Sequence, residues 1–480
     1  MSLAPISRPS VFPGTSASAG RNPPESMREG GLWLGSRFSM IRRTAQLALL
    51  VFGAGLAQLP ALADSAIAPF EPLPQPLTLQ DALRLSGENH PNLRLARAGV
   101  LAAQIRLKKV ESSFGASVLL ELQPRAASKA SVSGVDFQND SRYGLVWRKR
   151  LTDFGRSASR REVAGATLQA EQAIYEARHG RHTLEIMERF FAVTLADYTY
   201  QMHDERMAIS YFRYTRMLER QTRFEQYSDL EVAEREVTYR QQYVARLHAD
   251  LQRRQTRHQL ALALGRPGEL SSELVMPDLA VYRKREVPKY ADLVDRVILS
   301  SPALQFLRHD VAAAKAAIDV ARKLNSPVLS AELEAREYVN STSSSRDRYR
   351  ANLKFSMPLF DGTGGRNIEV ALAQNTLLHK QAALASSEYV VREEVLMLLH
   401  ELEVNRAEEA AAQAQETYRG YYQDRSRAMY ELELRSDLGD AQAAAAEAML
   451  ESIRVDFERA LLWTQLDSLL GLPSALIQEN

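Results

Sequence analysis

The sequence has 480 residues, of which 45% are hydrophobic and 25% are charged, so the chain can bury a core and form two or three domains. Its 60 basic residues nearly balance its 59 acidic residues, without the basic cluster that nucleic-acid binding requires. The absence of cysteine excludes disulfides, thiolate metal sites, a cysteine nucleophile and an acylated N-terminal cysteine. Because of this charge balance, we expect no nucleic-acid partner.

The N-terminal segment has the features of an export leader. Residues 40–43 supply a positive region, residues 45–59 an apolar stretch and residues 61–63 a small-residue cleavage site. The apolar stretch is too short to favour a spanning helix, although an N-terminal membrane anchor is the alternative. We predict that residues 1–63 are a leader and signal peptide, with Met40 as a possible true start. An exported chain is periplasmic, secreted or part of an outer-membrane barrel.

The first of two similar halves, residues 64–290, begins with a helix opened by Thr78 and Asp81, a pair close to a capping box. Ser228 and Glu231 form a second capping box further along. After the first helix we expect a β-hairpin over about 116–151, a long helix over about 157–224 and a return helix over about 229–264.

The second half, residues 291–476, repeats the first. The repeated landmarks are His90-Pro91 with Ser301-Pro302, Phe154-Gly155-Arg156 with Phe360 to Arg366, Ser228-Asp229-Leu230 with Ser436-Asp437-Leu438, and Leu264-Gly265 with Leu470-Gly471. We expect a helix, a β-hairpin over about 328–360, a long helix over about 366–434 and a return helix over about 437–470. Each half has roughly 200 residues, far above the about 20–50 of solenoid repeats, so the chain is an internal duplication.

The predicted strands alternate between apolar and polar residues. Leu333, Leu353 and Phe355 belong to the apolar set, whereas Glu332, Glu334 and Lys354 lie between them. Strands of this kind suit a transmembrane barrel with lipid outside and water inside. The alternative is an antiparallel sheet that covers a soluble core.

Four strands cannot close a membrane barrel, because the smallest single-chain barrels need about eight. An open sheet in lipid would leave unpaired backbone groups at its edges. We therefore expect several chains to pool their strands, and three chains with four strands each would give twelve.

The long helices exceed what one globular core requires. A helix from about 157 to 224 would span roughly 100 Å. Helices of this length pack on one another through narrow apolar seams, as in coiled coils. Phe190, Phe191, Leu195, Tyr198 and Met202 have helical spacing, and we interpret them as seam residues rather than a ligand site.

This order of elements, with two particular motifs, resembles the TolC-like outer membrane factors. The motifs are residues 357–366, Met-Pro-Leu-Phe-Asp-Gly-Thr-Gly-Gly-Arg, and residues 89–93, Asn-His-Pro-Asn-Leu, shortly after Thr78. The resemblance extends from Leu77 to about Leu476. It implies a mainly α-helical homotrimer with a long coiled-coil tunnel in the periplasm and one shared twelve-stranded β-barrel in outer-membrane lipid.

The implied function is that of a passive exit duct in a tripartite efflux pump or a type I secretion system. Its partners would be a periplasmic adaptor protein and an inner-membrane pump or ABC transporter. The alternative is a periplasmic coiled-coil adaptor or scaffold. An adaptor would show one helical hairpin flanked by small β-domains, whereas this chain has two hairpins and amphipathic strands.

Two glycine-containing segments are expected to turn the chain from strand to helix. They comprise Asp153, Gly155 and Arg156 in the first half, and Asp361, Gly362, Gly365 and Arg366 in the second. Glycine relaxes the backbone at such an elbow. A phosphate-binding loop is excluded, because no Gly-Lys-Ser/Thr follows.

The resemblance also implies an acidic ring at the periplasmic aperture, with Asp437 and Asp440 at the ring positions and Arg427 and Arg435 as compensating charges. The alternative is that these two acids only complement the start of a helix. Ser228, Asp229, Arg435 and Ser436 are expected at the helical tips, where an adaptor would bind. In the family a Gly usually precedes each tip turn, whereas here residues 225–227 and 433–435 contain none.

Nothing in the sequence converges on a catalytic or cofactor site, so we expect no enzyme, cofactor or metal. His179 and His182 are three residues apart on a helix and could form a metal pair, but no third ligand has a useful spacing. We interpret the two histidines as part of a solvated helix face.

Overall fold

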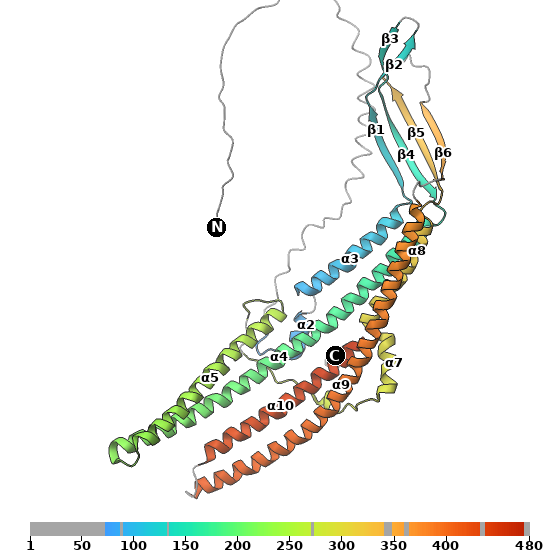
Figure 1. Ribbon diagram of the computed structural model, residues 1–480. Helices are drawn as coiled ribbons and strands as arrows, with labels where there is room; N and C mark the ends of the chain where they lie inside the picture. The colour runs from blue at the N-terminus through green and yellow to red at the C-terminus, as the bar shows by residue number, and fades with distance from the viewer. Residues whose placement is uncertain are drawn as a thin grey trace, which may run out of the picture. The chain divides into compact units, whose positions relative to one another are not determined.

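The computed structural model describes residues 73–86, 90–131, 134–269, 273–339, 348–359, 364–432 and 437–474. The predicted leader, residues 1–63, lies outside these residues. The described residues belong to one compact unit that begins at Leu73. Figure 1 shows a sheet at one end of this unit and two helical hairpins at the other.

As far as Ala263, the described residues of the first half form four helices and four strands. They are α2 (Leu79–Ser86), α3 (Pro91–Ser112), β1 (Ala116–Gln123), β2 (Ala126–Ser131), β3 (Gly134–Asn139), β4 (Arg142–Thr152), α4 (Arg156–Phe224) and α5 (Asp229–Ala263). The expected single helix before the hairpin is two helices, because His90 and Pro91 begin a new one: the His90 side chain accepts a hydrogen bond from the Asn92 amide. The expected simple hairpin is extended by a second small sheet of β2 and β3.

A short helix, α6 (Ala280–Arg283), ends the first half. The second half has the same order of long elements without the small sheet. It contains α7 (Tyr290–Ser300), α8 (Pro302–Arg322), β5 (Val328–Tyr338), β6 (Tyr349–Ser356), α9 (Gly365–Glu431) and α10 (Leu438–Leu469). The two halves also have the same backbone geometry at the bases of their hairpins. Gly265 and Gly471 both have left-handed backbones, with φ of 69° and 70°. A Cβ at Gly265 would lie 3.5 Å from His90 Cα, and one at Gly471 would lie 3.5 Å from Pro302.

The larger sheet has the strand order β1-β4-β5-β6, with every pair antiparallel. Its register places Glu121, Gly144 and Arg336 in one row, and Trp147, Leu333 and Ala351 in another. Successive side chains point to opposite faces of a sheet. The sheet therefore has one polar face and one apolar face, as the alternation in the sequence predicts, and its two edges are β1 and β6.

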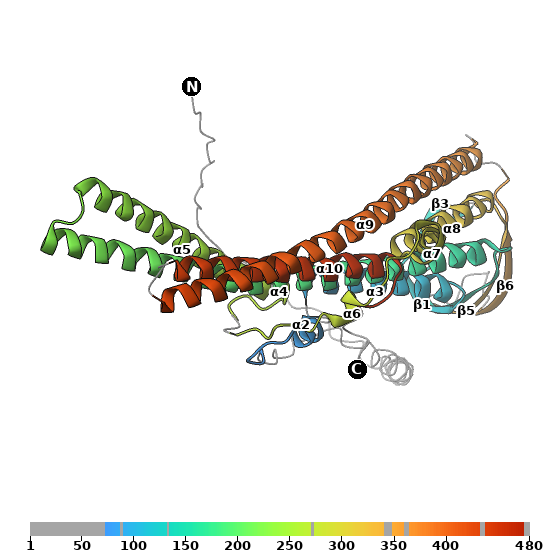
Figure 2. The same ribbon diagram turned by 90° about the horizontal axis from the view of Figure 1, so that it is seen from below.

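The helices form a layer centred on α4. Towards the sheet, α4 packs between α3 and α8, and α8 packs on α9. Towards the tips, α4 packs between α5 and α10, and α10 packs on α9. The two hairpins, α4–α5 and α9–α10, reach the same end of the unit, and the first extends further (Figures 1 and 2). At 69 residues, α4 is about 100 Å long.

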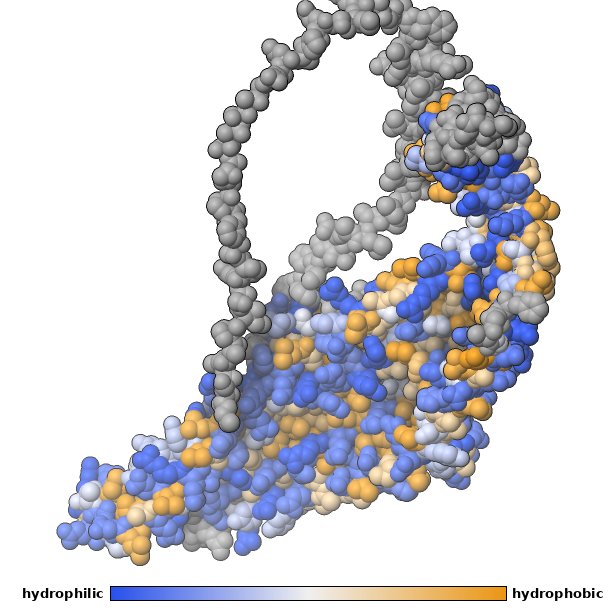
Figure 3. All heavy atoms as spheres, turned by 45° about the horizontal axis from the view of Figure 1, so that its top comes forward, coloured by the Kyte–Doolittle hydropathy of each residue, from blue (hydrophilic) through white to orange (hydrophobic). Residues whose placement is uncertain are grey.

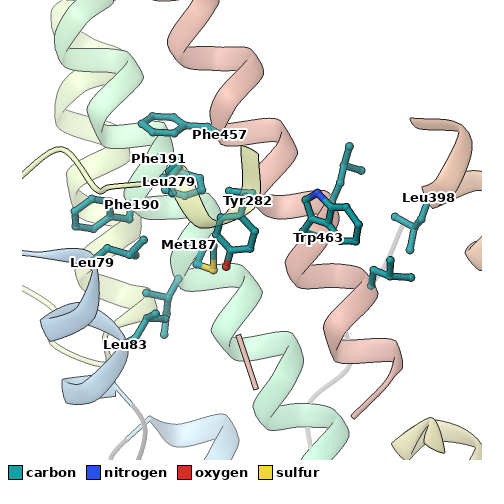
Figure 4. Close-up of a cluster of buried hydrophobic side chains, with 14 of the residues drawn as sticks. Leu79, Leu83, Met187, Phe190, Phe191, Leu279, Tyr282, Leu398, Phe457 and Trp463 are labelled. Atoms are coloured by element: carbon teal, nitrogen blue, oxygen red, sulfur yellow. The ribbon is translucent and has the colours of Figure 1, made fainter. Parts of the chain in front are cut away.

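The main core joins the two halves where the hairpins begin (Figure 4). Phe190 and Phe191 of α4 are buried there, and the Phe191 ring stacks on Phe457 of α10 with centroids 4.2 Å apart. Met187 and Tyr282 lie beside them. The interpretation of Phe190, Phe191 and Met202 as packing residues is confirmed, since all three are buried.

Candidate functional site

The polar face of the sheet is a network of ion pairs. Arg148 of β4 donates to Glu332 of β5 at 2.8 Å. Arg336 lies 3.0 Å from Glu334 and 3.3 Å from Glu121, which is two strands away. Gly144 lies on β4, between the strand of Glu121 and the strand of Arg336. A Cβ at this position would come within 2.9 Å of the Arg336 side chain. Glycine is required at this position because a Cβ would come within 2.3 Å of the Ala335 carbonyl oxygen and would also crowd the Arg336 side chain.

The apolar face of the sheet is uncovered. Leu333, Leu353 and Phe355 are 49%, 69% and 59% exposed, as are other residues of this face: Val118, Leu120, Leu122, Tyr143 and Leu145. In Figure 3 apolar residues gather along the right-hand edge of the sheet end. A continuous apolar surface of this kind marks a contact with lipid or protein.

Two long edges of the unit also expose apolar residues. We call β1, α3 and α5 the first edge, and β6 and α9 the second edge. The exposed apolar residues recur every seven positions along α5, at Leu230, Val237, Val244 and Leu251, and along part of α9, at Val390, Met397 and Val404. A repeat of seven with apolar side chains is the pattern of a coiled-coil seam. Both edges therefore have the form of helix–helix interfaces that no helix among the described residues covers.

The first elbow joins β4 to α4 through a left-handed turn. Phe154 and Gly155 have φ of 54° and 88°. The buried Asp153 carboxylate accepts a hydrogen bond from the Ser157 amide at 3.0 Å and another from the Ser157 hydroxyl. Burial raises the pKa of Asp153, but these hydrogen bonds and the nearby Arg150 and Arg156 outweigh it, so the net pKa is lowered. The carboxylate thus stays ionised and holds the start of α4.

The same elbow is tied to the second half. Arg156 donates to the backbone carbonyl oxygens of Leu324 and Ser326, at 3.1 and 3.4 Å. Lys323 donates to the Ser159 hydroxyl at 2.9 Å. The segment that leads from α8 into β5 is therefore fixed against the start of α4.

The second elbow is described only in part. Asp361 and Gly362 lie outside the described residues, while Gly365 and Arg366 open α9. Gly364, which precedes them, has a left-handed backbone with φ of 68°. Both long helices thus begin after a left-handed glycine, which in the second half is Gly364 and not one of the predicted elbow residues.

The tip of the first hairpin is closed by its own residues. Ser228 accepts from the Glu231 amide at 3.3 Å, and Glu231 accepts from the Ser228 amide at 2.8 Å, so the predicted capping box is confirmed. Gln221 donates to Asp229 at 2.6 Å. Glu225 has a left-handed backbone with φ of 51°. It takes the conformation that a glycine would adopt more easily.

The tip of the second hairpin has one contact within its own hairpin and one to the first hairpin. Asp440, in the first turn of α10, accepts two hydrogen bonds from Arg213 of α4, both 2.9 Å long. Asp437, one residue before α10, accepts from the Tyr422 hydroxyl of α9 at 3.2 Å. The two acids therefore engage different helices. Arg435 and Ser436 lie outside the described residues, and the partner that the structure gives Asp440 is Arg213.

One expectation about histidine was wrong. His182 is only 5% exposed, so it does not lie on a solvated face. Its ring stacks on His90, with centroids 4.2 Å apart, at the base of the first hairpin. Burial lowers the pKa of His182, and the neighbouring His90 lowers it further, while Glu185 opposes the shift.

Neither a metal site nor a membrane-spanning helix is found among the described residues. Within them no three His, Asp or Glu side chains come together in a group that could hold a metal ion. Across the same residues, none of the helices combines the length and the apolar character needed to cross a membrane.

Solved structures share this fold. The Campylobacter jejuni CmeC outer membrane channel has a TM-score of 0.69 and 16% identity, over 82% of this chain and 85% of that chain. The open state of the Neisseria gonorrhoeae MtrE outer membrane channel has a TM-score of 0.64 and 18% identity, over 82% and 89%. The Vibrio cholerae outer membrane protein VceC has a TM-score of 0.64 and 13% identity, over 82% and 96%.

The protomer therefore has the fold of outer-membrane channels, in which long helices carry a few barrel strands. Residues 293–472 also match the family model described as outer membrane efflux protein. This match and the shared fold confirm the resemblance to the TolC-like outer membrane factor family. No curated protein matches the sequence.

Proposed function

We propose that the chain is one protomer of a homotrimeric outer-membrane channel that serves as a passive exit duct for efflux. The observation that carries this proposal is the pair of uncovered edges. Among the described residues, the first edge ends in β1 and the second in β6, which are the two edge strands of the sheet, and exposed heptad seams continue along α5 and α9. Two different edges on one protomer join head to tail, and such an interface closes into a ring when the rotation permits.

Ring closure accounts for both the strands and the helices. Pairing β6 of one protomer with β1 of the next satisfies the backbone groups that an open sheet would expose. Three sheets of four strands then form a twelve-stranded barrel. The same rotation brings the seam of α9 against the seam of the neighbour's α5. The uncovered apolar face would contact lipid, and the polar face would line the lumen.

The helices then form a tunnel of about 100 Å that leads away from the membrane into the periplasm. Its far end carries the tips, where Ser228, Asp229, Arg435 and Ser436 are proposed to contact a periplasmic adaptor. An inner-membrane pump or ABC transporter would deliver the cargo. Both a tripartite efflux pump and a type I secretion system fit this arrangement, and the fold shared with CmeC and MtrE, which are outer membrane channels, supports the duct itself.

Asp437 and Asp440 are proposed to line the aperture of this tunnel. In support, Asp440 is bound by an arginine of the other hairpin, so its position depends on how the two hairpins pack. Replacing both acids with Ala should lower the cation preference of the channel in planar bilayers, since acidic rings favour cations. An unchanged preference would make them simple helix-end acids.

The assembly of three protomers into a ring is tested by charges placed on the first edge. Val237→Glu with Val244→Glu puts two acids on the seam of α5, and burying unpaired charges in an interface costs several kcal/mol. We expect the parent to require detergent and to sediment as a trimer, whereas the variant sediments as a monomer. Arg235→Glu, on the other side of α5, is the control and should remain trimeric. A parent that is monomeric without detergent would overturn the proposal.

The orientation of the barrel is tested by adjacent residues on β6. Leu353→Arg places a charge on the apolar face, where a midplane position costs about 2–4 kcal/mol. Lys354→Glu changes the neighbouring residue on the polar face. We expect a large loss of membrane-inserted trimer for the first and little loss for the second. Equal losses would contradict the assignment of faces.

A further inference from the structure

The polar face of the sheet carries more positive than negative side chains. By register its cations are Arg142, Arg148, Arg150, Arg336, Arg350 and Lys354, and its anions are Glu121, Glu332 and Glu334. Asp153, at the first elbow, lies 3.8 Å from Arg150 and adds one more carboxylate. Six cations against four carboxylates leave an excess of two positive charges on each protomer.

The carboxylates are engaged by only part of this set. Arg148 binds Glu332, Arg336 binds Glu121 and Glu334, and Arg150 approaches Asp153. Arg142 instead donates to the neutral Gln123 side chain at 2.6 Å. Among the described residues, Lys354 forms no ion pair. The excess charge is therefore carried by side chains at specific places and is not dispersed over the network.

A further cation of this face, Arg350, also has a partner within the chain. Arg142 and Lys354 lie near opposite ends of the strands. Arg142 opens β4 at the end next to the small sheet, paired with Gln123 and Tyr338. Lys354 is in the row of Ser330 and Arg150, close to the helices. In a ring of three protomers, each row becomes a belt around the lumen, so basic belts would stand towards both ends of the barrel.

We propose that the barrel lumen, unlike the acidic aperture proposed at the other end, selects for anions, so that this part of the duct favours cargo bearing carboxylate, phosphate or sulfate groups. This inference rests on the proposed channel function, because it requires the polar face to line the lumen. The three protomers together hold an excess of six positive charges, twice three. Rings of arginine and lysine side chains are the usual basis of anion selectivity in pores.

Screening does not cancel this field within a narrow lumen. The Debye length is about 8–10 Å at physiological salt, which is comparable to the distance from a barrel wall to its axis. A lumen with low-dielectric walls also focuses the field of like charges and concentrates counterions. The charge excess therefore acts on the permeating solute and not only on neighbouring side chains.

The test measures reversal potentials in planar bilayers under a KCl gradient. Asp437→Asn with Asp440→Asn is the background, so that the acids proposed for the aperture do not mask the barrel. We expect the background channel to prefer chloride over potassium. Arg142→Gln with Lys354→Gln brings the luminal face to neutrality, and the chloride-to-potassium permeability ratio should fall by roughly two- to fourfold.

Two matched variants make the result specific. Lys149→Gln removes a cation from the opposite face of β4 and should leave the ratio unchanged. Arg142→Lys with Lys354→Arg keeps both charges and should retain the chloride preference. A background channel whose ratio does not respond to neutralising Arg142 and Lys354 overturns this inference but leaves the channel intact. A parent that forms no pore overturns the channel proposal and the inference together.

Discussion

The two helical hairpins come from duplicated halves of the chain, but their tips are held in different ways. The first tip is closed locally, by the capping box of Ser228 and Glu231 and by the bond from Gln221 to Asp229. At the second tip Tyr422 of the same hairpin binds Asp437, but Asp440 binds Arg213 of the first hairpin, so this tip also depends on a neighbouring helix. A locally closed tip keeps its shape when its neighbours move, whereas a tip held from outside can be released by them.

The bases of the hairpins show the opposite relation. There the two halves share one core, with Phe191 of α4 stacked on Phe457 of α10. Both rings are almost fully buried. The hairpins are thus joined by a buried core at the base and, towards the tips, by two partly exposed ion pairs, Arg206–Glu447 and Arg213–Asp440.

The largest effect is expected at the shared base. Phe457→Ala removes a ring that is 2% exposed and should lower the free energy of unfolding by about 3–5 kcal/mol. Chemical denaturation in detergent, followed by circular dichroism, measures this loss. Phe224→Ala, at the exposed end of α4, is the control and should change little. Equal denaturation midpoints for the two variants would show that the base is not the firm point.

The next prediction concerns pH, which should affect the stability of the two hairpins differently where each hairpin begins. Because burial and His90 lower the pKa of His182, the folded protein resists protonation there, whereas an unfolded histidine takes up a proton near pH 6.5. The stabilising effect of neutral His182 is therefore present above pH 6.5 and is lost as pH falls below it. Ser301 holds the place of His90 in the second half, so that base lacks the pair.

Hydrogen exchange at pH 7.5 and 5.5 measures this difference. The backbone at residues 90–93 should lose protection at the lower pH more than the backbone at residues 301–304. His182→Asn should reduce the pH dependence at the first base only. Glu185 and His179 also face His182 and remain in this variant, so a pH dependence that persists unchanged would assign the effect to them.

The locally closed tip predicts a smaller loss. Ser228→Ala removes the side chain that caps α5, and such caps contribute about 1 kcal/mol. Hydrogen exchange should accelerate in residues 228–232, while residues 437–441 of the second tip serve as an internal reference and stay unchanged. Acceleration at both tips would mean that the first tip also supports the second.

A gain of similar or smaller size is expected at Glu225. Its left-handed backbone costs an L-residue about 1–2 kcal/mol, and Glu225→Gly removes that strain at some cost in chain entropy. We expect a net stabilisation of up to about 1 kcal/mol, seen as slower exchange around the first tip. Glu219→Gly, in the interior of α4, should instead destabilise the helix by about 1 kcal/mol. A loss at both positions would contradict the strained turn.

The smallest effect is expected for the ion pair between Arg213 and Asp440, which links the two hairpins. Arg213 and Asp440 have side chains that are 36% and 60% exposed, and exposed ion pairs contribute about 0.2–1 kcal/mol. A double-mutant cycle with Arg213→Ala and Asp440→Ala isolates this coupling through local exchange in residues 438–445. Additive effects of the two substitutions would mean that the ion pair does not hold the second tip.

Regular patterns in the sequence were sufficient to predict the strands and long helices. Period-two alternation placed Glu332 and Leu333 on opposite faces, and the observed register agrees. The capping box at Ser228 was equally legible because it depends on residues close in sequence. The small sheet of β2 and β3 was missed, since segments such as Ala-Ala-Ser-Lys-Ala-Ser lack a strong strand pattern.

Contacts between distant segments were not predictable in the same way. Arg213 was missed as the partner of Asp440, because finding it requires the axial offset between the two hairpins, which packing alone sets. Burial of His182 was missed for a related reason: its neighbour His90 comes from a loop about 90 residues away. A close approach of the same origin exists at Gly439, where a Cβ would lie 3.1 Å from Ile209.

The tie between Arg213 and Asp440 also bears on symmetry. In the repeat alignment that pairs Ser228 with Ser436, Asp440 corresponds to Val232 and Arg213 to Tyr421, so neither partner has a counterpart in the other half. Three such chains would present six hairpins. Because the ion pair has no counterpart in the other half, these six hairpins would be of two alternating kinds and not six equivalent ones. A ligand built from six identical subunits would then meet two distinct docking environments, and its own subunits would have to adopt two poses.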